Sequence, residues 1–183
     1  MVRLIAHPAF PLSAPFEVEA AFSANALEFT VHGDIDRLLI PPRAPPARTD
    51  ELWRHTCFEL FVRDPAGEGY REFNFSPSGE WAAYALEGYR AGMRELAVEP
   101  PVIRTQRQPD QLVIAISLPP FLLSVSKPVP GTRSGRTGPV GVSAILEETE
   151  GTKSYWALAH PPGMPDFHNP ACFALELPAP QTP

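Results

Sequence analysis

The sequence predicts an all-β domain: a two-sheet antiparallel β-sandwich with a jelly-roll-like arrangement and at most one or two short helices. Three observations predict this class. About ten strand-like segments follow one another at intervals of roughly 8–12 residues. The chain has 24 prolines in 183 residues, which disfavours long helices and suits short strands joined by loops. The stretch 52–89 also has the pattern of a β-hairpin followed by a third strand.

The central hairpin is the most regular part of the sequence. Segments 54–63 and 70–76 are rich in strand-forming residues, and the Asp-Pro-Ala-Gly-Glu-Gly between them is typical of a turn. If the hairpin is symmetric about this turn, side-chain alternation predicts its register. The expected core-facing pairs are Phe58–Phe75, Leu60–Phe73 and Val62–Arg71, and the expected pairs on the other face are Cys57–Ser76, Glu59–Asn74 and Phe61–Glu72. The hairpin therefore predicts one apolar face and one polar, ligand-accessible face.

The remaining elements follow from alternation and from turn residues. The expected elements are a hairpin of 16–22 with 27–32, a strand at 35–40, a strand at 81–86, a short helix at 88–99, a hairpin of 102–107 with 111–118, a helical turn at 121–123, a flexible loop at 127–139, a hairpin of 140–146 with 154–160, and a last strand at 172–177. The register of 81–86 is ambiguous by one residue, so the faces of Trp81 and Tyr84 stay open. We expect one domain over 1–178 and a disordered tail at 179–183.

Charge and composition exclude several classes of partner. The formal net charge of −6 argues against a general nucleic-acid binder and against an anionic membrane surface. No segment approaches the roughly 20 apolar residues of a membrane span. The N-terminal stretch MVRLIAHPAF lacks an apolar run long enough for a signal peptide, so we expect a cytoplasmic protein. Cys57 and Cys172 are expected to be reduced and buried.

Polar and aromatic residues cluster at the start of the central hairpin and point to a ligand. Trp53, Arg54 and His55 precede Glu59 in the sequence. The C–H face of a sugar ring packs on an indole, and carboxylates and amides bond to sugar hydroxyls. Asn74 shares the strand face of Glu59. Two further candidates lie late in the chain: Trp156, one of two adjacent rings that face opposite ways, and His168. The alternative is that Trp53 plugs the core and Glu59 pairs with an arginine.

Glu59 and Glu72 also admit other roles. Two carboxylates on one strand face are the groups that acid–base hydrolysis of a glycoside requires. Carboxylates are also the ligands that Ca²⁺ prefers. The third alternative is ion pairing with Arg63, Arg71 or Arg90.

The segment after the last hairpin offers a metal or haem alternative. His160 and His168 bracket a Pro-rich loop that carries Met164, and Met93 is another possible axial ligand. The competing interpretation is that these histidines only form hydrogen bonds that hold the loop in place. The sequence contains no GxGxxG, P-loop, GxSxG, HExxH or CxxC motif, so the common nucleotide, hydrolase and zinc classes lack support.

Two blocks of the chain resemble a bacterial DOMON-like family related to family-nine carbohydrate-binding modules. The blocks are LWRHTCFELFV with YREFNFSPSGEWAAY, and YWALAHPPGMPDFHNPACFALELP. The shared pattern is a Trp followed six residues later by Glu, then a Tyr-x-x-Phe strand and a Gly turn, here Trp53, Glu59, 70–75 and Gly79. The resemblance covers most of the chain and implies a β-sandwich whose members bind sugars or haem.

The resemblance also implies roles for single residues. Trp53 corresponds to one wall of a sugar clamp, Glu59 to a hydroxyl-binding carboxylate, and Asn169 to a polar contact near the last strand. The second clamp aromatic falls on Cys172 or Phe173, where no Trp stands.

These observations lead to one expectation and two alternatives. We expect a non-catalytic domain without a cofactor that binds a sugar, a glycan or a sugar-containing metabolite. The first alternative is a domain that binds haem b through His160, His168 or Met164, with calcium as another possible cofactor. The second is a small enzyme that uses Glu59 and Glu72.

Overall fold

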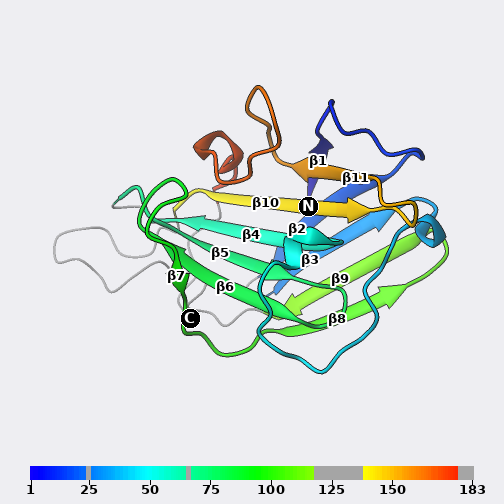
Figure 1. Ribbon diagram of the computed structural model, residues 1–183, viewed down its shortest axis with the longest axis horizontal. Helices are drawn as coiled ribbons and strands as arrows, with labels where there is room; N and C mark the ends of the chain where they lie inside the picture. Colours follow the sequence, from blue (N-terminus) through cyan, green and yellow to red (C-terminus); the bar gives the residue numbers. More distant parts are fainter. Residues whose placement is uncertain (24–25, 65–66, 118–137, 177–183) are drawn as a thin grey trace.

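The strands form one antiparallel sheet that curls into a half-barrel (Figure 1). The computed structural model describes residues 1–23, 26–64, 67–117 and 138–176. Within them, eleven strands are hydrogen-bonded in the order β7-β6-β5-β4-β10-β11-β1-β2-β3-β9-β8. The all-β prediction is confirmed. We expected two separate sheets. The strands instead form one continuous sheet, because hydrogen bonds link each strand to the next from β7 at one edge to β8 at the other.

The elements have the following bounds in chain order. The strands are β1 (Val2–Ala6), β2 (Glu17–Ser23), β3 (Ala26–His32), β4 (Cys57–Arg63), β5 (Tyr70–Phe75), β6 (Trp81–Leu86), β7 (Arg94–Glu95), β8 (Val102–Arg107), β9 (Gln111–Ser117), β10 (Val140–Glu147) and β11 (Lys153–Ala157). Three short 3₁₀ helices are described: η1 (Ile35–Arg37), η2 (Leu52–Arg54) and η4 (Pro170–Cys172). In the described part of the chain, no helix has the length and apolar character needed to cross a membrane.

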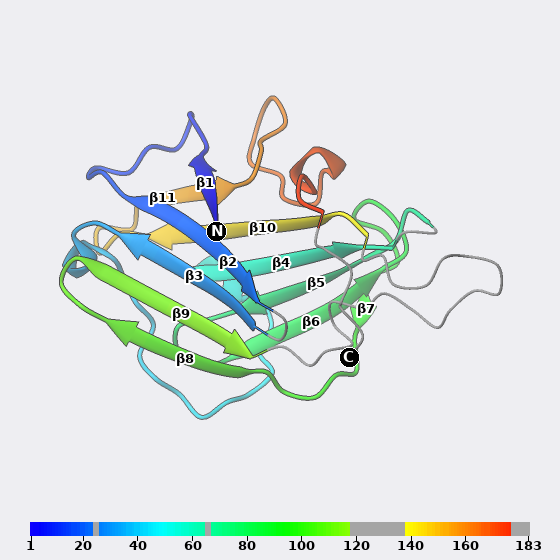
Figure 2. The ribbon, with the colours of Figure 1, turned by 180° about the vertical axis from the view of Figure 1, so that it is seen from behind.

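The sheet has two halves that face each other across one core. In Figure 1 the strands β10, β4, β5 and β6 lie in front of β2, β3 and β9, and Figure 2 shows the reverse. Strand β1 joins the halves, because Leu4 pairs with β2 and Ile5 pairs with β11. Apolar side chains of both halves meet between them, as in the contact of Phe29 with Phe58 at 5.0 Å between ring centroids. This shared core holds the curl of the sheet.

The register of the central hairpin is confirmed. Phe58 pairs with Phe75 and Glu59 pairs with Asn74, and the pairs predicted for residues 60–62 also form. Alternation then resolves the strand whose face the sequence left open: Trp81 belongs to the core and Tyr84 to the opposite face. That opposite face of β4, β5, β6 and β10 carries the candidate site.

Three predicted elements are wrong. Residues 35–40 form η1 and a single bridge at Leu38 instead of a strand. The expected helix at 88–99 is a loop with β7, because Arg90 and Gly92 have positive φ values of 51° and 64°, which a right-handed helix excludes. The described part of the expected last strand, residues 172–176, is not a strand: Asn169 caps η4, and of these residues only Leu175 bridges the sheet.

Other expectations concern residues beyond those described. The helical turn at 121–123, most of the loop at 127–139 and the tail at 179–183 lie outside the described residues.

The pairings of 16–22 with 27–32, of 102–107 with 111–118 and of 140–146 with 154–160 are confirmed within small shifts of their ends. Strand β1 was not predicted from the sequence. Cys57 and Cys172 are free and buried.

Candidate functional site

An open cleft of about 860 Å³ lies over the sheet face that points away from the core. Side chains of β4, β5, β6 and β10 form its floor. Residues 50–54, which include η2, form one wall, and the loop at 90–95 and the segment at 165–168 form the others. Residues 158–176, here called the terminal segment, run beside β10 and β11 in orange and red (Figure 1).

The floor of the cleft holds two buried carboxylates. Glu59 and Glu72 are 3% and 5% exposed, and both line the cleft because strand alternation turns them away from the core. Ser143 lies opposite Glu59 on β10, and its Oγ donates to Glu59 Oε2 at 2.7 Å. Asn74 lies opposite Glu59 on β5, and its Nδ2 donates to Glu72 Oε1 at 2.9 Å. Asn74 Oδ1 is buried and has no described partner.

Burial makes the charged forms of these carboxyl groups unfavourable. The pKa of Glu59 is raised to about 8, first by burial and then by the charge of Glu72, while the hydrogen bond from Ser143 and the charge of Arg90 oppose the rise. Burial also raises the pKa of Glu72, against the hydrogen bond from Asn74 and the charge of Arg90. Among the described residues, no lysine or arginine forms an ion pair with either carboxylate. At neutral pH the pair therefore retains a proton.

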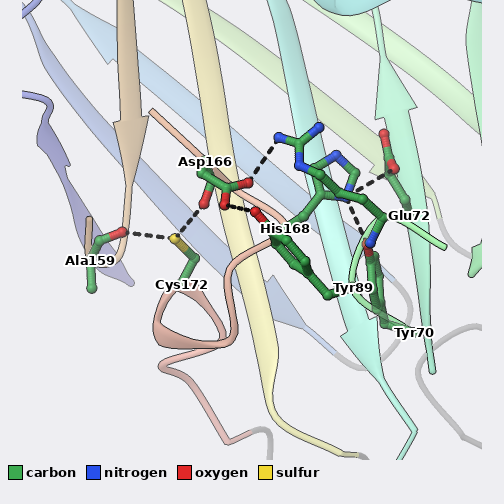
Figure 3. Close-up of polar contacts among 8 residues, drawn as sticks. Tyr70, Glu72, Tyr89, Ala159, Asp166, His168 and Cys172 are labelled. Atoms are coloured by element: carbon green, nitrogen blue, oxygen red, sulfur yellow. Dashed lines mark hydrogen bonds and ion pairs between the residues drawn. The ribbon is translucent and has the colours of Figure 1, made fainter. Parts of the chain in front are cut away.

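His168 closes one end of this floor (Figure 3). Its Nδ1 lies 2.8 Å from the Tyr70 hydroxyl and 3.9 Å from Glu72 Oε2. The Tyr70 hydroxyl accepts from the backbone N–H of Arg90 at 3.2 Å, which leaves its own proton for Nδ1. The pKa of His168 is lowered to about 4, mainly by burial and then by the charge of Arg90. His168 is therefore neutral at pH 7.

Asp166 holds the terminal segment against the loop at 88–91 (Figure 3). It accepts from the Tyr89 hydroxyl at 2.6 Å and from Arg90 Nη2 at 2.8 Å. Within the segment, Cys172 Sγ donates towards the carbonyls of Ala159 at 3.2 Å and Asp166 at 3.3 Å. These contacts keep the wall formed by residues 165–168 in place over the floor.

An exposed aromatic ring stands on the rim. Trp53, on η2, is 47% exposed and lines the cleft, so it is not a core plug. The Arg54 guanidinium lies 5.4 Å from its ring centroid and donates to Glu51 Oε1 at 2.8 Å. On the floor beneath, Tyr84 donates its hydroxyl proton to Asp50 Oδ1 at 2.5 Å.

Most of the residues proposed from the sequence meet in this cleft. Trp53, Arg54, Glu59, Glu72 and His168 line it, and Asn74 lies beside the two carboxylates without reaching the surface.

Three proposed residues lie elsewhere. His55 Nδ1 is bonded to Glu147 Oε2 at 2.7 Å, outside the described lining of the cleft. Asn169 Oδ1 accepts from the backbone of Ala171 as the cap of η4. Trp156 belongs to the core on the opposite face of the sheet, where its Nε1 donates to Ser154 Oγ at 2.7 Å. Strand alternation places its neighbour Tyr155 in the cleft instead.

The residues named for haem do not come together. His160 Nε2 bonds the Ile5 carbonyl at 2.8 Å, and Met164 is 69% exposed; neither is among the described lining residues. Only His168 and Met93 of the named ligands line the cleft. His160, His168 and Met164 are therefore not gathered at one place in the described part of the chain. The described residues also contain no group of three or more His, Cys, Asp or Glu side chains arranged to hold a metal ion such as calcium.

Several residues that shape the site were not predicted from the sequence. For Tyr155 the prediction was incomplete: one ring of the pair at 155–156 had to face outward, but the sequence did not show which. Tyr84 needed only the register of β6. Arg90 was expected only as a possible ion-pair partner of the carboxylates. Its contact with Asp166, and that of Asp50 with Tyr84, could not be predicted, because they join segments that lie far apart in the chain.

Solved structures, but no sequence families, resemble this chain. No protein-family model and no curated protein matches it. A candidate carbohydrate-binding protein from Bacteroides uniformis is similar in structure, with a TM-score of 0.57, 15% identity, and coverage of 94% of this chain and 83% of that one. A family 9 carbohydrate-binding module from Caldicellulosiruptor kristjanssonii has a TM-score of 0.40 and 13% identity, both in complex with cellotriose (84% and 69% coverage) and with glucose (84% and 71%). The chain thus shares the all-β fold of the Bacteroides uniformis protein.

Proposed function

We propose that this protein is a non-catalytic carbohydrate-binding domain and that the cleft beside Trp53 is its binding site. The observation that carries the proposal is the combination of an exposed indole on the rim with buried hydrogen-bonding groups on the floor of one open cleft. A sugar presents the same combination, with an apolar C–H face and a set of hydroxyls. We assign the domain to the DOMON-like type, since the Trp53–Glu59 pattern that suggested it lies within this cleft.

The cleft has the capacity and the chemistry for such a ligand. Its volume of about 860 Å³ lies in the range typical of small-molecule sites. The ring of Trp53 supplies the stacking surface, and Tyr155 lines the same cleft. Glu59, Glu72 and the neutral His168 supply hydrogen-bonding atoms. The Bacteroides uniformis protein, described as a candidate carbohydrate binder, has the same fold and supports the assignment.

A glycan array followed by calorimetry on its hits tests the proposal. We expect Trp53→Ala to weaken binding at least tenfold without changing the melting temperature by more than a few degrees, because the ring is half exposed. Val102→Ala is the control: Val102 is 54% exposed on β8, in the other half of the sheet, and its loss should leave affinity unchanged. Absence of any glycan binding, or an unchanged affinity in Trp53→Ala, refutes the proposal.

One observation favours a second candidate function. A carboxyl group with a raised pKa beside a second carboxylate in an open cleft is the arrangement that general acid–base catalysis uses. The alternative is therefore a small hydrolase in which protonated Glu59 donates and Glu72 accepts. Turnover of chromogenic glycosides or esters that disappears in Glu59→Gln supports it, and the absence of turnover across such a panel excludes it.

A further inference from the structure

We propose that the floor of the cleft recognises a protonated primary amine, so that the preferred ligands are amino sugars rather than neutral sugars. The inference rests on the proposed carbohydrate binding and specifies its ligand class. The feature that carries it is the group of buried hydrogen-bond acceptors of Glu59, Glu72 and Asn74, which have no lysine or arginine partner among the described residues.

The floor has more acceptors than donors. Asn74 uses Nδ2 to donate to Glu72, so its Oδ1, buried with no described partner, is left as an acceptor. Ser143 donates to only one oxygen of Glu59. The nearest atom of His168 to Glu72 is Nδ1, and that atom is engaged by the Tyr70 hydroxyl. Buried carboxylate oxygens with too few donors cost free energy, and a ligand that brings N–H groups to Glu59 and Glu72, which line the cleft, relieves that cost.

The cations near the cleft are engaged elsewhere. Arg90 forms its ion pair with Asp166, and Arg54 forms its pair with Glu51. Lys153 Nζ lies 3.8 Å from a carboxylate oxygen of Glu147 on β10. Arg94 lies on the exposed edge strand β7 and forms no described ion pair with the floor. Within the described part of the chain, the carboxylates at the bottom of the cleft therefore have no lysine or arginine bonded to them, and a cationic ligand would not compete with one of these side chains there.

An ammonium group suits this floor better than a hydroxyl does. It carries three N–H donors and a positive charge, whereas a hydroxyl has one donor and no charge. Charge-assisted hydrogen bonds to carboxylates are roughly twice as strong as neutral ones. The pKa of Glu59 is raised first by burial and then by the charge of Glu72, and this second cause is one that a cationic ligand would offset. The groups that face Glu59 are Glu72 and Asn74 on β5, Ser143 on β10, Tyr84 on β6, Arg90 in the loop at 88–91 and His168 in the terminal segment.

Calorimetry at pH 7 with matched pairs of sugars tests the inference on the wild-type protein. The pairs are glucosamine with glucose, and 6-amino-6-deoxyglucose with glucose, so each pair differs only in an amine that replaces one hydroxyl. We expect the amino member of at least one pair to bind tenfold or more tightly than its neutral counterpart. The preference should weaken as salt is added, since part of it is Coulombic.

Two isosteric variants then locate the preference. Glu59→Gln and Glu72→Gln keep the shape of the side chain but cannot take up the negative charge that pairs with an ammonium group, so each should reduce the preference at least fivefold. Glu28→Gln is the matched control, because Glu28 is exposed on β3 in the other half of the sheet, away from the cleft, and should leave the preference intact.

The outcomes separate this inference from the proposed function. Neutral and amino sugars that bind equally well overturn the inference and leave carbohydrate binding in place. An amine preference that survives in both floor variants also overturns it, because the charge then lies elsewhere. If no sugar of the panel or the array binds, both proposals fall.

Discussion

Replacing Glu59 by glutamine tests the electrostatics of the cleft floor without any ligand. The folded protein raises the pKa of Glu59 from 4.5 to about 8, so between these values the folded state holds a proton that the unfolded state lacks. Stability therefore falls as pH rises through this window. Below it both states are protonated, and burial costs little. Above it the folded state must bury the charge.

The expected size follows from the shift. One pKa unit corresponds to about 1.4 kcal/mol, so the loss of stability between pH 5 and pH 9 is at most on the order of 5 kcal/mol. Glu72 contributes with the same sign, because burial raises its pKa as well. Glutamine imitates the protonated carboxyl and removes the charge. At pH 9 the variant should be more stable than the wild type by roughly 2 kcal/mol or more, and at pH 5 the two should nearly coincide.

Guanidinium unfolding followed by tryptophan fluorescence at pH 5, 7 and 9 measures this difference. Glu28→Gln on the exposed face of β3 is the control and should follow the wild-type curve at every pH. Equal stability of Glu59→Gln and wild type at pH 9, or a variant that is less stable there, would refute the reasoning about the buried charge.

Three further predictions concern the fold and the terminal segment. Phe58→Ala removes a fully buried ring from the shared core and should cost about 3–5 kcal/mol in chemical unfolding; a cost below 1 kcal/mol contradicts that packing. Gly33→Ala places a Cβ 2.5 Å from a ring carbon of Phe16 at a φ of +144°, so the melting temperature should drop by several degrees, and an unchanged value contradicts the predicted strain. Asp166→Asn weakens the pair with Arg90 and should speed hydrogen exchange in residues 158–176 while strands β2 and β3 stay protected; uniform protection throughout would show that this pair does not hold the segment.

Strand alternation and turn residues were sufficient to predict the hairpins and the row of polar side chains, including Glu59 and Asn74, on one face of the central hairpin. Strand alternation and a turn of fixed length place Glu59 opposite Asn74 wherever the hairpin lies, so their pairing could be derived from the sequence. The same rule required one ring of the pair at 155–156 to face outward. It could not say which, because a shift of one residue exchanges the two faces.

Other features depend on contacts between segments distant in the chain. β1 was missed because five residues carry little pattern, yet this strand joins the two halves into one sheet. The expected helix at 88–99 failed because the contact of Arg90 with Asp166, a residue 76 positions later, accompanies a left-handed turn in the loop.

Alternating side chains and turn residues were thus enough to establish an all-β chain, the register of its central hairpin and a strand face that carries acidic groups. Three-dimensional packing alone determined that this face lies under an open cleft, that Tyr155 rather than Trp156 lines it, and that none of the described arginines forms an ion pair with its carboxylates. The physical reason is the distance along the chain over which each effect acts. Alternation acts between neighbours along a strand, whereas burial and charge pairing depend on which distant segments close over that strand.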